Sequence, residues 1–186
     1  MKSIFKNSFT AFLGLMIFSN AFAQPFIELP KQEIPAEYEF TAKIGDSIPN
    51  FTMTLTNGKI VSSKDWRGKV VMLQFTTSWS GVCRKVIPLI EQEIWTKNKH
   101  DRNFVLYGVD RDEPLEKVKR YQKEMEITYP IAIDPFADVF GIFADKKAGV
   151  TRNVILDKQG KIVFMTRLYK ESEFKEMVRV ISLLLK

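Results

Sequence analysis

Residues 74–85 read QFTTSWSGVCRK, and this stretch decides the fold. Just before and into it, Val70 to Phe75 form a near-continuous apolar run, which is typical of a strand buried on both faces. After it, apolar residues recur at helical spacing from about Val82 to Lys97. The stretch therefore predicts a buried strand that runs into a helix beginning at Ser80 or Gly81. The first turn of such a helix offers unpaired N–H groups that stabilise an anion.

The rest of the chain alternates strand patterns with helix patterns. Asn57-Gly58 separates two short strand-like runs and predicts a hairpin whose turn needs a positive φ. Further strands are expected at 104–109, 129–133, 152–156 and 162–166, and further helices at 114–125, 139–143 and 171–185. Pro88 predicts a kink in the first helix, and Pro130 predicts either an edge strand or a strand start. Together these patterns predict an α/β sandwich around a mixed sheet.

Composition limits the chemistry of the chain. Its 186 residues are 45% hydrophobic and 27% charged, which is ordinary for one globular domain and excludes a disordered or fibrous protein. Cys83 and His100 are the single cysteine and the single histidine, so a disulfide framework, a zinc site built mainly from Cys and His, and a self-contained dithiol cycle are excluded. We expect no metal and no cofactor. The net charge of +6 is mild and mixed with acidic residues, which argues against nucleic acid as a partner.

The first segment is interpreted as a targeting signal. Residues 1–23 combine Lys2 and Lys6, an apolar run and a small-x-small end, the pattern of a secretory signal peptide cleaved after Ala23. The apolar run is shorter than the ~20 residues of a membrane span, so we expect no span after cleavage. The sequence thus predicts export to the periplasm or cell envelope, an extended leader over 24–42 and one folded domain over 43–186.

The segment WSGVC at 79–83 resembles the W-C-x-x-C motif of thioredoxin-like thiol–disulfide oxidoreductases, specifically the exported TlpA/ResA-like branch of the AhpC/TSA-redoxin family. GDSIPNF at 45–51, GKVV at 68–71 and DKQGKIV at 157–163 are similar to three further motifs of that branch, in the same order. The resemblance implies a thioredoxin-like three-layer sandwich, with a mixed central sheet flanked by helices and an N-terminal hairpin. It also implies a central helix–strand insertion, here from about residue 112 to 149.

Three positions depart from the family pattern. Ser80 stands where the family has its attacking cysteine, and a hydroxyl is un-ionised at neutral pH and forms no disulfide. Cys83 matches the second, resolving cysteine. Thr151 stands where most relatives have a cis-proline; peroxiredoxins resemble the chain there, but their peroxidatic cysteine also maps to Ser80. Gln74 occupies the buried position where thioredoxin itself has an acid.

Each of these residues also has a plain structural interpretation. Ser80 is a good helix N-cap, worth ~1 kcal/mol over alanine, and Cys83 is either an inert buried side chain or a residual reactive thiol. Trp79 is either a packing residue or, as the resemblance implies, part of a binding groove with its neighbours Gly81 and Val82 and with Thr151.

Two acidic residues near the middle of the chain give only weak evidence for a functional site. Asp110 and Asp112 flank Arg111 in a predicted loop without the spacing of metal ligands, so they are interpreted as surface residues.

Three functions stay open. The first is an exported thioredoxin-family protein of thiol–disulfide oxidoreductase type, redox-impaired because Ser80 replaces the attacking cysteine. Its partners would be protein or peptide thiols and disulfides, or an electron-donor protein. The second is a non-catalytic, chaperone-like module that binds peptides in the groove beside Trp79, Ser80 and Thr151. The third is monothiol chemistry at Cys83, through glutathionylation or an intermolecular bridge.

Overall fold

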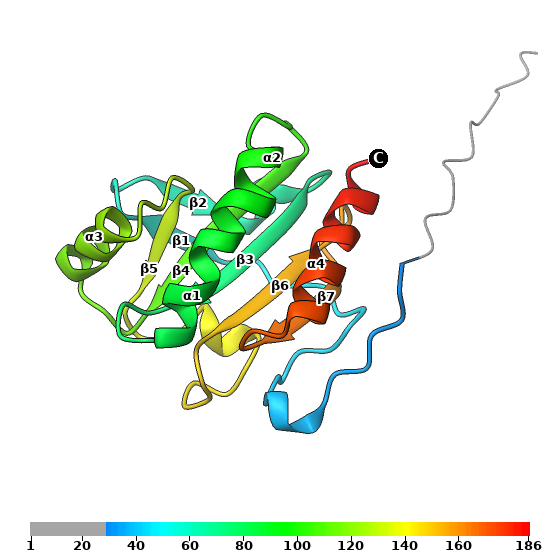
Figure 1. The fold of residues 1–186 in the computed structure, drawn as a ribbon, viewed down its shortest axis with the longest axis horizontal. Helices are drawn as coiled ribbons and strands as arrows, with labels where there is room; N and C mark the ends of the chain where they lie inside the picture. The colour runs from blue at the N-terminus through cyan, green and yellow to red at the C-terminus, as the bar shows by residue number, and fades with distance from the viewer. Residues whose placement is uncertain (1–28) are drawn as a thin grey trace, which may run out of the picture.

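The computed structural model describes residues 29–186, drawn in colour in Figure 1. The strands are β1 (Thr52–Leu55), β2 (Ile60–Ser62), β3 (Val70–Thr76), β4 (Phe104–Arg111), β5 (Ile131–Asp134), β6 (Arg152–Leu156) and β7 (Ile162–Arg167). The helices are α1 (Gly81–Ile90), α2 (Thr96–Asn98), α3 (Leu115–Glu124) and α4 (Glu171–Leu184). Short turns complete the set: 3-10 turns η1 (Ala36–Tyr38), η2 (Ser63–Trp66) and η4 (Phe140–Ile142), and the π turn η3 (Glu91–Trp95). The signal peptide predicted for residues 1–23 lies outside the described residues.

The strands form one mixed sheet in the order β2-β1-β5-β4-β3-β6-β7. β3 and β4 pair in parallel, as do β4 and β5, whereas the other neighbours are antiparallel. β3 lies inside the sheet and every one of its seven residues is buried, as its continuous apolar run predicts. Pro130 immediately precedes β5, which lies between β1 and β4. The strand-start interpretation of this proline is therefore correct and the edge-strand interpretation is wrong.

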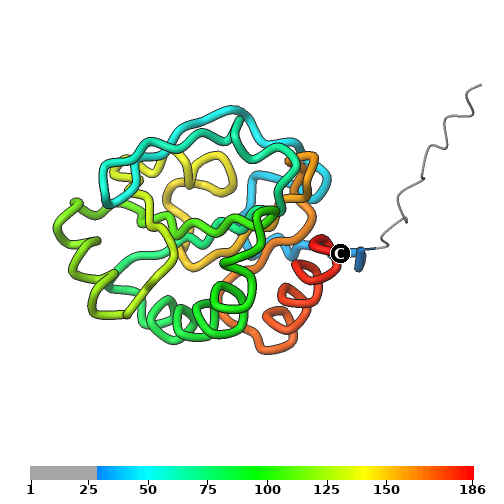
Figure 2. The backbone as a smooth tube through the Cα atoms, turned by 90° about the horizontal axis from the view of Figure 1, so that it is seen from above, coloured from blue at the N-terminus to red at the C-terminus, as the bar shows by residue number. Residues whose placement is uncertain are grey.

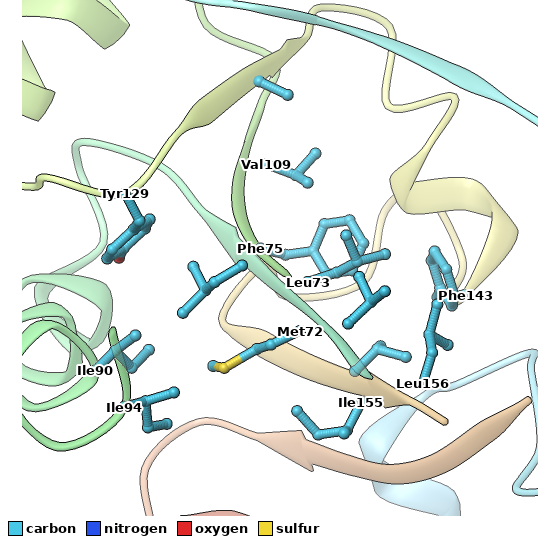
Figure 3. Packing of buried hydrophobic residues seen from close by; sticks show 14 of the residues in the cluster. Met72, Leu73, Phe75, Ile90, Ile94, Val109, Tyr129, Phe143, Ile155 and Leu156 are labelled. Atoms are coloured by element: carbon cyan, nitrogen blue, oxygen red, sulfur yellow. The ribbon is translucent and has the colours of Figure 1, made fainter. Parts of the chain in front are cut away.

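Helices α1, α3 and α4 lie on one face of the sheet, as the view from above shows (Figure 2). The 3-10 turn η4 and its flanking loops cover the opposite face. β3 contributes to both layers: Met72 packs toward Ile90 and Ile94, whereas Phe75 points toward Phe143 (Figure 3). The ring centroids of Phe75 and Phe143 are 5.5 Å apart. This arrangement confirms the predicted thioredoxin-like α/β fold.

The first helix is longer than α1 alone. The chain continues from α1 through η3 into α2, so the helical segment extends from Gly81 to Asn98. Pro88 lies within it, and the change to π geometry follows just after this proline. Proline has no N–H to donate to the preceding turn, which weakens the regular α pattern at this point.

The described part of the leader, residues 29–42, packs against the domain. The Gln32 side chain lies on the edge strand β7, where its Oε1 accepts the Met165 N–H at 2.9 Å and its Nε2 donates to the Met165 carbonyl at 2.6 Å. Tyr38 is buried, and its hydroxyl bonds Glu173 and Lys170 at the start of α4. The leader thus contains a 3-10 turn that its sequence did not predict. Within residues 29–186, every helix falls short of the length and apolar character that a bilayer crossing requires.

Candidate functional site

Ser80 immediately precedes helix α1, a short loop after the end of the central strand β3. Its backbone is extended, and its Oγ accepts the Cys83 N–H at 3.2 Å. The predicted N-cap is therefore confirmed. The same bond places the side chain of Ser80 at the positive end of the helix dipole, where a negatively charged atom would be stabilised.

Cys83 and Thr151 complete a buried cluster with Ser80. Thr151 Oγ1 lies 3.0 Å from Cys83 Sγ and 3.1 Å from Ser80 Oγ, so one hydroxyl contacts both side chains. Cys83 has no solvent exposure, and its hydrogen-bond neighbours among the described side chains and carbonyls are Thr151 and the carbonyl of Phe75. Neither neighbour carries a charge. Residues 80, 83 and 151, which were singled out from the sequence, therefore meet at one place.

Trp79 lies at the outer rim of this cluster. It is 65% exposed, which rules out the interpretation of this side chain as a core packing residue. Gly81 is exposed and Val82 is half-buried. Leu168 lies close by, because its N–H donates to the Thr151 carbonyl at 3.0 Å, and its side chain is also exposed.

Glu113 holds the loop that carries Trp79, and sequence reasoning missed this residue. Its carboxylate accepts the Ser78 N–H at 2.6 Å and the Ser78 hydroxyl at 2.7 Å, and it pairs with Lys117 at 2.6 Å. Burial by itself would raise the pKa of Glu113, but the bonds from Lys117 and Ser78 lower it below its usual value. Glu113 therefore stays ionised and anchors the loop from below.

Asp110 corrects a prediction from the sequence. It was interpreted as a surface residue in a loop, but β4 continues to Arg111 and Asp110 is completely buried. No N–H or O–H group among residues 29–186 donates to either carboxylate oxygen, and the nearby Glu113 carboxylate can bond Asp110 only through a proton that the two share. Burial, and after it the negative charge of Glu113, raises the pKa of Asp110 to about 8. The sequence did hold a signal for this position: Asp110 directly follows the apolar run 104–109, and the carboxyl ends of parallel strands, where it lies beside Thr76 of β3, are where sites form in α/β sheets.

Gln74 lies in the core beneath the site. It is buried, its Nε2 donates to the Phe75 carbonyl at 3.1 Å, and its Oε1 accepts the Tyr129 hydroxyl at 3.3 Å. A neutral amide is therefore satisfied where thioredoxin has an acid, and a buried acid, Asp110, lies instead on the neighbouring strand β4.

The N-cap gives a first testable prediction. Ser80→Ala removes the acceptor for the Cys83 N–H and is expected to lower the free energy of unfolding by about 1 kcal/mol. Ser80→Gly is the matched control and should cost only a few tenths of a kcal/mol, since glycine is itself well tolerated at a helix N-cap. Urea unfolding measures both variants. Equal stability of Ser80→Ala and the unaltered chain would contradict the capping role.

Comparison with known proteins agrees with this geometry. The family model described as Redoxin matches residues 43–181, which includes all seven strands and the whole site. The chain belongs to the redoxin family. Thiol-disulfide oxidoreductase ResA of Bacillus cereus is 31% identical over 121 residues, covering 65% of this chain and 68% of the relative. This redoxin is therefore a thioredoxin-family protein of thiol–disulfide oxidoreductase type.

Solved structures place the fold in the same group. A solution structure described as a candidate protein disulfide isomerase from Bacteroides thetaiotaomicron shares 53% identity, with a TM-score of 0.77 over 79% of this chain and 92% of the other. A crystal structure described as a candidate thiol:disulfide interchange protein DsbE from Chlorobium tepidum has a TM-score of 0.67 at 23% identity, covering 78% of this chain and 100% of the other. The likeness to this second structure supports only the fold of this redoxin.

Proposed function

We propose that this redoxin is an exported protein that, as its sequence stands, does not carry out thiol–disulfide exchange. In exchange, a thiolate attacks one sulfur of a substrate disulfide and forms a mixed disulfide, while the other sulfur leaves as a thiolate. A second thiol then releases the substrate. The attacking position at the start of α1 holds Ser80, whose hydroxyl is un-ionised at neutral pH and cannot take part in a disulfide.

The observation that carries this proposal is the hydrogen bonding of Ser80 and Cys83. The Ser80 hydroxyl caps α1 where an attacking sulfur would lie, and the single thiol of the chain, that of Cys83, is fully buried and in contact with Thr151. Cys83 therefore cannot replace the missing nucleophile without movement of the surrounding residues. Electron transfer by a pair of cysteines is excluded by the cysteine count.

The family supports a class of partners, and the sequence of residues 1–23 supports a location. We assign Ser80, Cys83 and Thr151 to the reactive positions of the site. Its rim is assigned to Trp79, Gly81 and Val82. The relatives' description as thiol–disulfide oxidoreductases supports protein or peptide thiols and disulfides as partners of this rim. The signal-peptide pattern of residues 1–23 supports export to the periplasm or cell envelope.

An insulin-reduction assay tests the proposal. The purified chain, with dithiothreitol as reductant, is expected to precipitate insulin no faster than dithiothreitol alone, because no thiolate is available for the first attack. Thioredoxin serves as the positive control in the same buffer. Insulin reduction by the unaltered chain at the rate of thioredoxin would overturn the proposal.

A further inference from the structure

Arg152, the residue after Thr151, is buried against the leader. It is 1% exposed, its Nε donates to the Gly149 carbonyl at 2.9 Å, and its Nη1 donates to the Tyr38 carbonyl of the leader. Its guanidinium also lies 4.5 Å from the ring centroid of Phe40. One side chain therefore joins the loop that carries Thr151 to a segment more than a hundred residues earlier in the sequence.

A second buried arginine holds the same loop. Arg111 Nη1 donates to the Ala148 carbonyl at 2.6 Å and to the Lys146 carbonyl at 3.2 Å. With Arg152 on Gly149, three carbonyls of the segment before Thr151 are bound by guanidinium groups. Threonine lacks the ring by which a proline would fix the backbone φ, so this loop depends on such bonds for its shape.

The leader is bonded to the domain on both sides of its contact with Arg152. On one side, the hydroxyl of Tyr38 bonds Glu173 and Lys170 of the α4 region. On the other side, the N–H groups of Thr41 and Ala42 both donate to the Phe143 carbonyl. A continuous chain of contacts therefore extends from α4 through the leader and Arg152 to Thr151.

The burial of Arg152 is costly for a charged group. Burial, together with the nearby charges of Arg167 and Arg111, lowers the pKa of Arg152 to about 10. Glu39 lies 3.8 Å from its Nη2, an atom that has no hydrogen bond within the described residues. A buried cation with one distant counter-charge is stabilised by its carbonyl bonds, so loss of those bonds would free both the leader and the loop.

We propose that Arg152 is a positioning residue that ties the docked leader to the loop of Thr151 and thereby keeps Cys83 covered. Undocking of residues 38–40 releases Gly149, the Thr151 hydroxyl leaves Cys83 Sγ, and the thiol becomes accessible. The leader thus controls access to the site from a distance. This inference rests on the proposed function only in taking residues 80, 83 and 151 as the site.

The test measures the rate at which iodoacetamide alkylates Cys83, the single thiol of the chain, under native conditions. Urea unfolding of each variant gives the global unfolding constant for comparison. Arg152→Lys keeps the charge but cannot bond both carbonyls, and it should raise the alkylation rate about tenfold more than it raises the unfolding constant. Tyr38→Phe loses only the hydroxyl bonds to α4 and should show an excess in the same direction.

Val118→Ala is the matched control. Val118 is buried on α3, which packs on the β5 side of the sheet, away from the leader. Its alkylation rate should rise no more than its unfolding constant. Alkylation rates of Arg152→Lys and Tyr38→Phe that follow their unfolding constants in the same proportion would overturn the inference. The assay needs no disulfide exchange, so its failure is separate from that of the proposed function, which insulin reduction alone decides.

Discussion

The Ser80→Cys variant is expected to reduce insulin disulfides at least about a hundredfold faster than the unaltered chain. The side chain at position 80 already accepts the Cys83 N–H at the start of α1, and a thiolate there would keep this bond and the favourable helix dipole. Thr151 Oγ1 contacts both position 80 and Cys83, so the two sulfurs would lie on either side of one hydroxyl. Replacing the side-chain oxygen of residue 80 by sulfur is therefore expected to be enough for the attack on a substrate disulfide to begin.

A double variant controls for the order of the two steps. Ser80→Cys combined with Cys83→Ala should form a mixed disulfide with a peptide substrate, visible by mass spectrometry, but should not turn over. If Ser80→Cys folds with unchanged stability and still leaves insulin intact, the site lacks more than the nucleophile, and Thr151 in the place of proline becomes the cause to examine.

Asp110→Asn is expected to stabilise the protein strongly at alkaline pH and weakly in acid. The folded pKa of Asp110 is raised to about 8, whereas an exposed aspartate titrates near ~3.9. Between these values the folded state keeps a proton that the unfolded state has released. The contribution of Asp110 to stability is therefore fully present below about pH 4 and is lost as the pH rises to about 8. Asparagine cannot ionise and removes this loss.

Urea unfolding at pH 5 and pH 8 measures the effect of Asp110→Asn. The stability difference between the variant and the unaltered chain should grow by on the order of 3 kcal/mol over this interval. Asp112→Asn, which removes the same charge from a half-exposed neighbour, is the control and should show little pH dependence. A difference that is the same at both pH values would contradict a buried, protonated Asp110.

The central part of the fold could be predicted from local patterns. The apolar run of β3 is typical of a buried strand, and the apolar spacing after Ser80 is typical of a helix. The structure contains both elements at these places. This pattern brings Ser80 and Cys83 to the same end of the sheet. Thr151 was singled out only by the resemblance to the family, because it stands where most relatives have a cis-proline.

The remainder depends on contacts that local patterns do not encode. Asp110 looked like a loop residue because charged residues seldom end a buried strand, yet here it pairs beside Thr76 in a parallel ladder. Arg152 and Tyr38 are far apart in the sequence, and a proline-rich leader shows no period that indicates where it will pack. Such positions are decided by tertiary packing, which overrides the preferences of the local sequence.

The amide of Gln32 has one further consequence for the whole molecule. It occupies the free N–H and carbonyl of Met165 on the outermost strand, as a neighbouring strand would. A second polypeptide therefore finds no free main-chain partner at this residue, which hinders the addition of another strand to β7 at this point. A glutamine in an irregular segment thus takes the place of a neighbouring strand at one residue of the sheet edge.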